Sequence, residues 1–184
     1  YAFSSDNWKR PVAEVGVLMQ LLQTYLRREV KRCREKGVRL SVIGRRDRLP
    51  PSLQATIGEV EEKTRNGATL HLRIAVDYSA RDALLRAACR FRHETVVPSP
   101  FAFARLLSGD DAPVPDVDVL IRTGGEHRLS DFLLWESAYA ELFFLDTCWP
   151  DFSPDDLAAV LDQFRQRDRR FGGLSSRQPE LQTL

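Results

Sequence analysis

The stretch VDVLIRTGGEHRLSDFLLWESAYAELFF (Val117–Phe144) predicts a strand, a glycine-containing loop, a helix and a second strand in succession. We expect the strands at Val117–Ile121 and Leu142–Leu145 and the helix near Asp131–Tyr139. Strands joined through a helix pair in parallel, because the crossover returns the chain to the edge from which it left. The stretch therefore predicts an α/β fold whose mainly parallel central sheet is flanked by helices.

The same alternation continues on both sides of this stretch. Apolar side chains recur at three- and four-residue steps from Val12 to Cys33, which is typical of an amphipathic helix ending near Gly37. Ser153–Asp156 has the capping residues of a closing helix, which we expect Gly172-Gly173 to end. The other predicted elements are strands at 38–43 and 70–76 and helices after Pro50-Pro51, at 81–92 and at 100–107. No linker is visible, so we expect one catalytic domain over residues 1–173 and a mobile tail over 174–184.

The charge balance excludes some classes of partner. The 184 residues carry 27 Lys and Arg against 26 Asp and Glu, so nothing draws the whole chain to nucleic acid. The basic helix face at Arg27–Arg34 is expected to be solvated, and a lipid-headgroup, partner or RNA surface is the alternative. No apolar run approaches the ~18–20 residues of a membrane span and no signal peptide is visible. We expect a cytoplasmic protein, with peripheral contact to a membrane surface left open.

The three cysteines, Cys33, Cys89 and Cys148, are far apart in the sequence and have no CxxC spacing. This odd-numbered set favours reduced thiols over a disulfide framework or a zinc site. We expect all three side chains to lie in the core.

The residues that directly follow the predicted strands are unusually basic. Ligands of an open parallel sheet bind beyond the carboxyl ends of the strands, so these segments form one candidate site. They are Ser4–Arg10, Arg45-Arg46, Asp77–Arg81 and Arg122–Ser130. No GxxxxGK[ST], GxGxxG, GxSxG or HExxH motif occurs. The sequence therefore predicts phosphate binding without a nucleotide signature.

The loop that follows the strand at 117–121 has the chemistry of a diphosphate site. Arg122 and Arg128 offer planar guanidinium groups that match phosphate oxygens, and Gly124-Gly125 lets backbone N–H groups turn toward an anion. Ser130 is expected at the start of the next helix, where free N–H groups favour an anion. A simple turn whose arginines pair with neighbouring carboxylates is the alternative.

Glu141 directly precedes the apolar run Leu142–Leu145. A carboxylate there suits Mg²⁺, which takes oxygen ligands and usually shares them with substrate phosphates. A capped or solvated glutamate at the strand edge is the alternative. His127 is either a base or an incidental loop residue.

Five stretches match a known pattern in the same order. They are YAFSSDNWKRP (1–11), RLSVIGRRDRLP (39–50), the stretch at 117–144, WPDF (149–152) and RDRRFGG (167–173). From Tyr1 to about Gly173 the chain resembles the undecaprenyl diphosphate synthases, which are bacterial cis-prenyltransferases. The resemblance implies the fold of that family, with two helices walling a hydrophobic tunnel. Apolar faces such as Val15, Met19, Leu22, Leu84 and Leu85 would line it, with core packing as the alternative for each.

The resemblance implies a Mg²⁺-dependent homodimer that extends an allylic diphosphate, farnesyl diphosphate in this family, with isopentenyl diphosphate. The cis-polyprenyl diphosphate product would partition to the membrane as a lipid-carrier precursor for the cell wall. Nucleic acid has no part in this activity. A non-catalytic subunit of a heteromeric cis-prenyltransferase is the alternative function, and the retained Arg122 and Glu141 disfavour it.

The resemblance also assigns roles to the segment after the first strand. Asn7 would be the proton acceptor; because an amide is a poor base, the alternative is that Asn7 orients the alkene while a diphosphate oxygen takes the proton. The residues that would contact substrate here are Ser4, Ser5, Asp6, Trp8 and Arg10.

Further roles fall in the second half of the chain. Glu141 would bind Mg²⁺, and Arg170 and Gly172 would reach the partner subunit's site. The residues that would hold isopentenyl diphosphate are Arg122, Arg128, Leu129 and Ser130.

Two departures from the family pattern stand out. A His-x-x-x-Met-Asp-Gly-Asn-Gly-Arg-Trp segment, which carries a second Mg²⁺-binding carboxylate, would come before Tyr1, so we expect a further segment upstream. The usual Asn-Tyr-Gly-Gly-Arg is replaced by Asp77-Tyr78-Ser79-Ala80-Arg81, which keeps only the tyrosine and the arginine.

Overall fold

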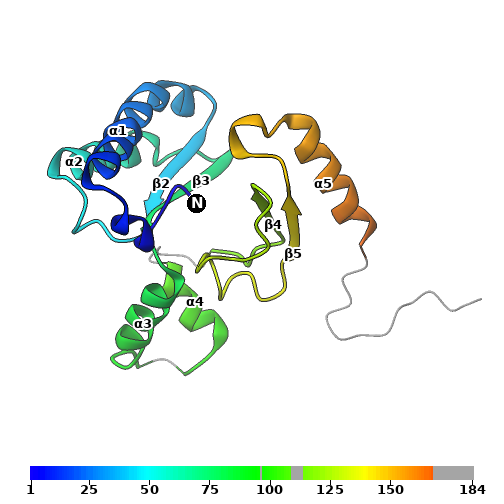
Figure 1. The fold of residues 1–184 in the computed structure, drawn as a ribbon. Coiled ribbons are helices and arrows are strands. Elements are labelled where there is room, and N and C mark those ends of the chain that lie inside the picture. The colour runs from blue at the N-terminus through cyan, green and yellow to red at the C-terminus, as the bar shows by residue number, and fades with distance from the viewer. Residues whose placement is uncertain (96, 109–113, 168–184) are drawn as a thin grey trace, which may run out of the picture. The chain divides into compact units, whose positions relative to one another are not determined.

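The computed structural model describes residues 1–95, 97–108 and 114–167. Contacts divide the chain into two compact units, Tyr1–Asp111 and Ala112–Leu184, and each unit is described by itself. Both are built from parallel strands and helices (Figure 1), which confirms the predicted fold class. The single domain over residues 1–173 stays a prediction, and the tail at 174–184 lies outside the described residues.

The sheet of the first unit has the strand order β1-β3-β2, with both pairings parallel. Its strands are β1 (Phe3–Ser4), β2 (Val38–Ile43) and β3 (Leu70–Tyr78). The helices are η1 (Ser5–Lys9), α1 (Val12–Glu35), α2 (Pro51–Thr64), α3 (Ala80–Phe91) and α4 (Pro100–Ser108). Strand β2 pairs with β3 from Val38 opposite Leu70 to Ile43 opposite Ala75. The carboxyl ends of the three strands therefore meet at one edge.

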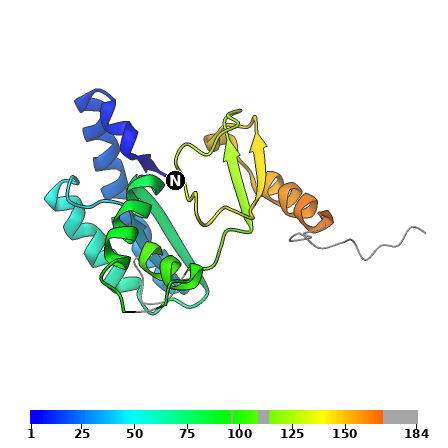
Figure 2. The ribbon, with the colours of Figure 1, turned by 90° about the horizontal axis from the view of Figure 1, so that it is seen from below.

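Helices α1 and α2 lie side by side against the β2–β3 pair (Figures 1 and 2). Met19 and Leu26 of α1, Ile57 of α2 and Val76 of β3 belong to one core cluster. Each is at most 4% exposed. Full burial of such a side chain stabilises the fold by about 1.5–3 kcal/mol. The apolar positions that the sequence spaces along α1 therefore pack against α2 and the sheet.

A close approach between two backbone segments ends β2. Gly44 has a φ of 116°, and a Cβ at this position would stand 2.0 Å from the carbonyl oxygen of Val76. Only glycine fits without a shift of β3. The next residue, Arg45, donates its backbone N–H to the Asp77 carbonyl at 3.1 Å. The loop after β2 is therefore tied to the end of β3.

The second unit contains a parallel strand pair and a closing helix. Its elements are β4 (Val119–Thr123), β5 (Glu141–Leu145), η2 (Trp149–Asp151) and α5 (Pro154–Gln166). Helix α5 begins as predicted: Ser153 Oγ accepts the Asp156 N–H at 3.2 Å, and the Asp156 carboxylate accepts the Ser153 N–H at 2.8 Å. This reciprocal capping box satisfies two N–H groups at the helix start. The helix ends at Gln166, before the predicted stop at Gly172-Gly173.

The helix predicted near Asp131–Tyr139 is wrong. These residues form turns, and Ser130, Asp131 and Leu133 have φ values of 48°, 60° and 43°. Residues in the left-handed region cannot continue a right-handed helix. Ser130 therefore does not lie at a helix N-terminus. The prediction that free N–H groups at a helix start favour an anion there is wrong.

Two of the three cysteine predictions are also wrong. Cys33 packs against the core, but Cys89 and Cys148 are exposed, and all three thiols are free. In the described ranges, no helix is long and apolar enough to cross a membrane.

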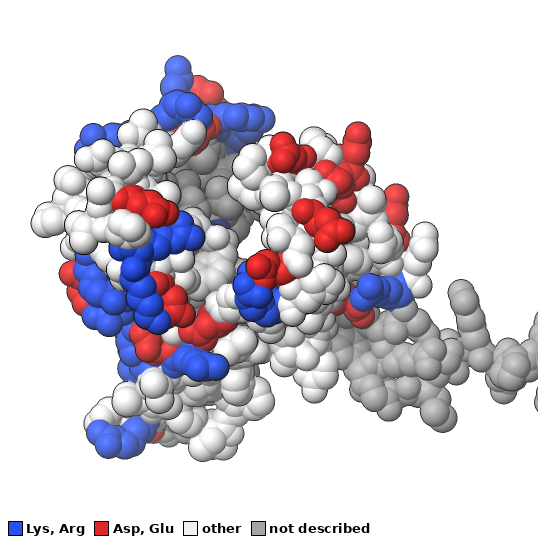
Figure 3. Space-filling view, in the orientation of Figure 1, with Lys and Arg blue, Asp and Glu red and all other residues white. Residues whose placement is uncertain are grey.

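The surface of the first unit carries charges of both signs. On α1, Lys31 lies 3.9 Å from Glu35 and Arg32 lies 3.7 Å from Glu29. Figure 3 shows the same mixture of Lys and Arg with Asp and Glu over the face in view. A mixed surface of this kind fits the solvated interpretation of the basic helix face rather than an RNA-binding surface.

Candidate active site

The loop after β4 joins three of the predicted site residues. Nη1 of Arg122 donates to Ser130 Oγ at 2.7 Å and also to the Arg128 carbonyl. Arg128 is exposed and forms an ion pair with Glu126. The structure thus brings Arg122, Arg128 and Ser130 into one loop, and it also contains an ion pair of the kind that the alternative interpretation required.

The two glycines of this loop do not present N–H groups to an anion. Gly124 donates to the Thr147 carbonyl and Gly125 to the Leu145 carbonyl, both at 2.9 Å. These bonds continue the β4–β5 ladder and engage both donors. The predicted backbone cradle at Gly124-Gly125 is therefore wrong, and an anion at this loop would be held by side chains.

Leu129 and His127 support the shape of the loop. The Leu129 carbonyl accepts the Phe132 N–H at 3.1 Å, which closes a turn. The His127 ring stacks on Phe144 of β5, with 5.1 Å between the ring centroids and an interplanar angle of 20°. The imidazole therefore packs on β5, and its role as a base stays a prediction.

Glu141 lies at the other end of the β4–β5 pair. It is the first residue of β5 and stands opposite Val119, whereas Arg122 stands opposite Phe144. Three residues along a strand span about 10 Å. The structure therefore does not bring Glu141 together with the arginine-bearing loop.

The Glu141 carboxylate has one engaged oxygen. Its Oε2 accepts a hydrogen bond from Arg167, whose guanidinium lies 4.5 Å from the centroid of the Phe143 ring. Its Oε1 makes no hydrogen bond to the residues that the structure describes. Within those residues no three His, Cys, Asp or Glu side chains gather as a metal site. Glu141 fits a single ligand position, as is usual for Mg²⁺ shared with phosphates.

The segment after β1 places Asn7 by a hydrogen bond. The Ser4 N–H donates to Asn7 Oδ1 at 2.8 Å. This donor requires the amide oxygen, so the Asn7 NH₂ group remains a hydrogen-bond donor. The role of Asn7 as proton acceptor stays a prediction.

Two buried polar atoms of η1 have no hydrogen-bond partner in the described part of the chain. They are Ser5 Oγ and Trp8 Nε1. Buried polar atoms in native proteins nearly always make a hydrogen bond. Two such atoms without one in a short segment therefore indicate that a bound molecule supplies the partner. Both residues are ones that the sequence predicted to contact substrate.

Charged residues of the same segment are paired with one another. Lys9 Nζ lies 2.7 Å from Asp6, and this hydrogen bond, with the charges of Lys9 and Arg81, lowers the pKa of the Asp6 carboxyl. Arg10 Nη1 donates to Glu14 Oε1 at 2.7 Å. Sequence reasoning missed Glu14, although its four-residue spacing from Arg10 on a helix start was the signal.

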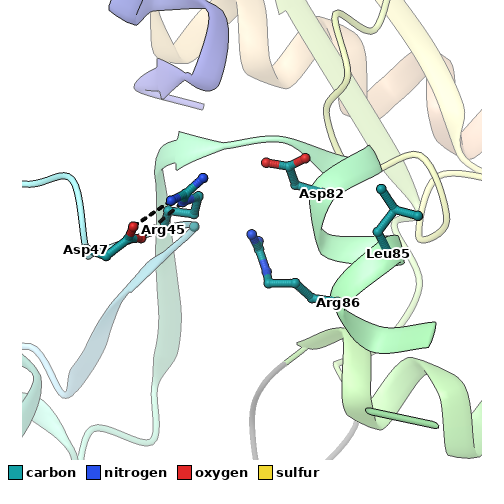
Figure 4. A pocket seen from close by; sticks show the side chains of 6 residues that line it. Arg45, Asp47, Asp82, Leu85 and Arg86 are labelled. Atoms are coloured by element: carbon teal, nitrogen blue, oxygen red, sulfur yellow. Dashed lines mark hydrogen bonds and ion pairs between the residues drawn. The ribbon is translucent and has the colours of Figure 1, made fainter. Parts of the chain in front are cut away.

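The arginines after β2 are paired with neighbouring carboxylates. A hollow of about 550 Å³ lies between this loop and α3 (Figure 4), lined by Gly44, Arg45, Asp47, Asp82, Leu85 and Arg86. Arg45 pairs with Asp47 at 2.5 Å and lowers the Asp47 pKa to about 2. Arg46 pairs with Glu61 at 2.6 Å. Two arginines and two aspartates line the hollow, so its charges balance. The basic character expected here is therefore offset by neighbouring carboxylates.

Arg170 and Gly172, predicted to reach the partner subunit's site, lie outside the described residues.

Comparison with known proteins identifies the family of this chain. The model of a family described as putative undecaprenyl diphosphate synthase matches residues 1–172. Isoprenyl transferase 1 of Bradyrhizobium diazoefficiens is 56% identical over 180 residues, covering 98% of this chain and 72% of that protein. A ditrans,polycis-undecaprenyl-diphosphate synthase ((2E,6E)-farnesyl-diphosphate specific) of Pseudomonas syringae pv. tomato is 45% identical over 182 residues, covering 95% and 72%.

Solved structures agree. A probable undecaprenyl diphosphate synthase from Campylobacter jejuni has a TM-score of 0.85 at 36% identity, over 93% of this chain and 80% of that chain. Lavandulyl diphosphate synthase from Lavandula x intermedia, in complex with dimethylallyl diphosphate, has a TM-score of 0.87 at 33% identity, over 93% and 76%. Fold, site and matches together define a prenyltransferase. The chain belongs to the undecaprenyl diphosphate synthase family, which confirms the resemblance seen in the sequence.

Proposed function

We propose that this chain condenses isopentenyl diphosphate with farnesyl diphosphate to give a cis-polyprenyl diphosphate. The observation that carries the proposal is the Arg122 guanidinium held at 2.7 Å from Ser130 at the end of β4. A relative named as specific for farnesyl diphosphate, 45% identical over 95% of this chain, supports the choice of primer. A fixed guanidinium beside a hydroxyl is suited to the oxygens of a diphosphate.

The loop after β4 would hold the head of isopentenyl diphosphate. Arg122 needs little reordering, because Ser130 and the Arg128 carbonyl already orient it. Arg128 would exchange Glu126 for a phosphate oxygen. An exposed ion pair contributes only about 0–1 kcal/mol, so this exchange costs little. Leu129 would keep the turn in shape.

The η1 segment would contact the substrates. Ser5 Oγ and Trp8 Nε1 are buried donors that lack an acceptor in the described chain. A substrate oxygen would accept their hydrogen bonds. Arg10, oriented by Glu14, would supply positive charge to a diphosphate. Ser4 and Asp6 would line the same surface.

Glu141 would be one ligand of Mg²⁺ through its free carboxylate oxygen, with phosphate oxygens as further ligands. When bound, the ion would stabilise the negative charge that develops on the departing diphosphate.

The proposed reaction breaks the allylic C–O bond, and its electron pair leaves with the diphosphate. The alkene of isopentenyl diphosphate forms the new C–C bond, and loss of a proton from the neighbouring carbon restores a double bond. Arg122 and Arg128 would neutralise the bound diphosphate head. Asn7 would orient a substrate through its NH₂ group, and a diphosphate oxygen would take the proton, because the Asn7 oxygen already accepts the Ser4 N–H.

The growing chain needs an apolar surface. Val15 and Met19 are 7% and 4% exposed and belong to the core, which supports core packing for these two residues. Val17, Leu21 and Tyr25 are spaced by four residues on α1 and are exposed by 54%, 47% and 51%. We assign the prenyl contact to this second face of α1.

We propose further that the enzyme is a cytoplasmic homodimer in which Arg170 and Gly172 complete the partner's site. Its product would partition to the membrane and serve as a lipid-carrier precursor for the cell wall. Size measurement of the purified protein in solution tests the dimer, and a monomer that turns over normally would contradict it.

The test of the function is product analysis with the full-length gene product. Radiolabelled isopentenyl diphosphate, farnesyl diphosphate and Mg²⁺ are incubated with the protein, and products are separated by reverse-phase chromatography. We expect a ladder of polyprenyl diphosphates with cis double bonds. Incorporation only after a second protein is added would instead support the non-catalytic subunit.

A further inference from the structure

Arg48 connects three segments of the first unit that are far apart in the sequence. It belongs to the loop between β2 and α2. Its Nε donates to Asp77 Oδ2 at 2.8 Å, and its Nη2 donates to Asp77 Oδ1. Its Cζ lies 5.4 Å from the centroid of the Trp8 ring. One guanidinium therefore touches the end of β3 and the η1 segment at the same time.

Asp77 makes the position of this guanidinium rigid. The carboxylate is 0% exposed, and Asp77 has a φ of 50° at the end of β3. A buried carboxylate without its cation would be strongly unfavourable, so Arg48 is held in the bidentate geometry. The Asp77 carbonyl is also fixed, because it accepts the Arg45 N–H at 3.1 Å.

Trp8 is held from two sides. The Phe3 and Trp8 rings pack edge to face, with 5.4 Å between their centroids and an interplanar angle of 78°. The Arg48 guanidinium also contacts the indole, with its Cζ 5.4 Å from the ring centroid. A guanidinium at this distance attracts an aromatic ring, and most strongly an indole. These contacts set the direction of the Trp8 Nε1–H, which is buried without a hydrogen-bond partner in the described part of the chain.

We propose that Arg48 is a positioning residue for the reaction: anchored by Asp77, it holds the Trp8 indole, and through it η1, in the geometry that contacts substrate. This inference rests on the proposed function of η1. The anchor of Arg48 is an ion pair with the buried Asp77 carboxylate. Arg48 itself was not among the predicted site residues.

The experiment compares Arg48→Lys with Arg46→Lys in the full-length protein. Arg46 is the matched control, because it lies in the same loop and binds Glu61 through two nitrogens, at 2.9 and 2.6 Å, away from Trp8. Lysine keeps the charge but loses the planar fork and the ring contact. Trp135→Phe and Trp149→Phe in the background, with phenylalanine also replacing any tryptophan outside residues 1–184, leave Trp8 as the sole tryptophan. Its fluorescence and acrylamide quenching then report its position without any substrate.

We expect Arg48→Lys to increase the quenching of Trp8 and to lower kcat/KM by roughly 5- to 30-fold. Arg46→Lys should change neither. In a double-mutant cycle, Arg48→Lys should cost much less in a Trp8→Phe background, because the coupling acts through the indole. If Arg48→Lys does not fold, Asp77→Asn is the second variant, and it should raise Trp8 quenching by loosening the same anchor.

Unchanged Trp8 quenching in Arg48→Lys or Asp77→Asn would overturn the proposal, as would full additivity in the cycle. Equal losses of thermal stability in Arg48→Lys and Arg46→Lys with no change in Trp8 would leave only a structural ion pair. Failure of the proposed function is distinguishable, because the unsubstituted protein would then make no polyprenyl product while the fluorescence comparison still reads out the position of Trp8.

Discussion

Nη1 of Arg122 donates to Oγ of Ser130 at 2.7 Å, so the last part of β4 is joined to the far end of the loop that follows it. Eight residues separate the two in sequence. The contact turns a flexible arginine into a preorganised one, and it holds the loop closed without a helix behind it.

Arg122→Ala should weaken binding of isopentenyl diphosphate by about 10- to 100-fold, since hydrogen bonds to charged groups contribute about 1.5–3 kcal/mol. Ser130→Ala should have a smaller effect in the same direction. Binding is measured by calorimetry in the presence of Mg²⁺. Arg165→Ala is the control, because Arg165 pairs with Asp162 on exposed α5. Normal binding by the Arg122 variant would remove this loop from the site.

Asn7→Asp separates the two roles considered for Asn7. A carboxylate still accepts the Ser4 N–H, so thermal stability should change little. It loses the NH₂ donor and adds negative charge beside a diphosphate, so turnover should fall by about 10- to 100-fold. If Asn7 were the base, aspartate would be the better base and would preserve or raise the rate. Asn66→Asp, on an exposed turn after α2, serves as the control.

Glu141→Gln and Arg167→Met should move the Mg²⁺ requirement in opposite directions. Loss of the carboxylate charge should raise the Mg²⁺ concentration at half-maximal turnover. Loss of Arg167, the cation that now binds Glu141, should lower it several-fold, because like charges near a metal site repel. Mg²⁺ titrations of turnover measure both. Identical titrations for the two variants and the unsubstituted protein would exclude Glu141 as a ligand.

Gly44→Ala should destabilise the protein by about 1–3 kcal/mol or more, because the new methyl group would collide with the Val76 carbonyl and φ is 116°. Gly58→Ala is the matched control in α2, where a Cβ meets nothing within 4 Å. It should stabilise by about 0.5–1 kcal/mol through helix propensity. Urea unfolding measures both changes. A Gly44 variant as stable as the Gly58 variant would contradict the close approach.

Ser153→Ala should lower the free energy of unfolding by about 1 kcal/mol at neutral pH, as loss of an N-cap usually does. Hydrogen bonds from the Ser153 side chain and backbone hold the pKa of Asp156 below its ordinary 3.8. The capping contribution is therefore present above pH 3.8 and is lost as pH falls through the lowered pKa. Unfolding followed by circular dichroism should show the two proteins converging in acid. Ser52→Ala, in the first turn of α2, should show no such pH dependence.

Local signals in the sequence predicted much of the fold. The strand at Val38–Ile43 is found where it was predicted, and α1 and α5 begin at the predicted residues. Each rests on a short-range cause: apolar spacing, proline in the first turn, or a capping pair. The turn at 131–139 was missed because its apolar spacing is helical, whereas the left-handed residues that break it leave no clear mark in the sequence.

The candidate site divides in the same way. The sequence by itself determined the family, the parallel α/β class and the arginine-bearing loop at 122–130, because motif chemistry and periodicity are written in neighbouring residues. Only the tertiary structure decided that Gly124-Gly125 has no free N–H groups, that Arg167 binds Glu141 and that Arg48 joins Asp77 to Trp8. Those contacts form between residues that chain folding brings together from a distance, and no local pattern encodes such pairs.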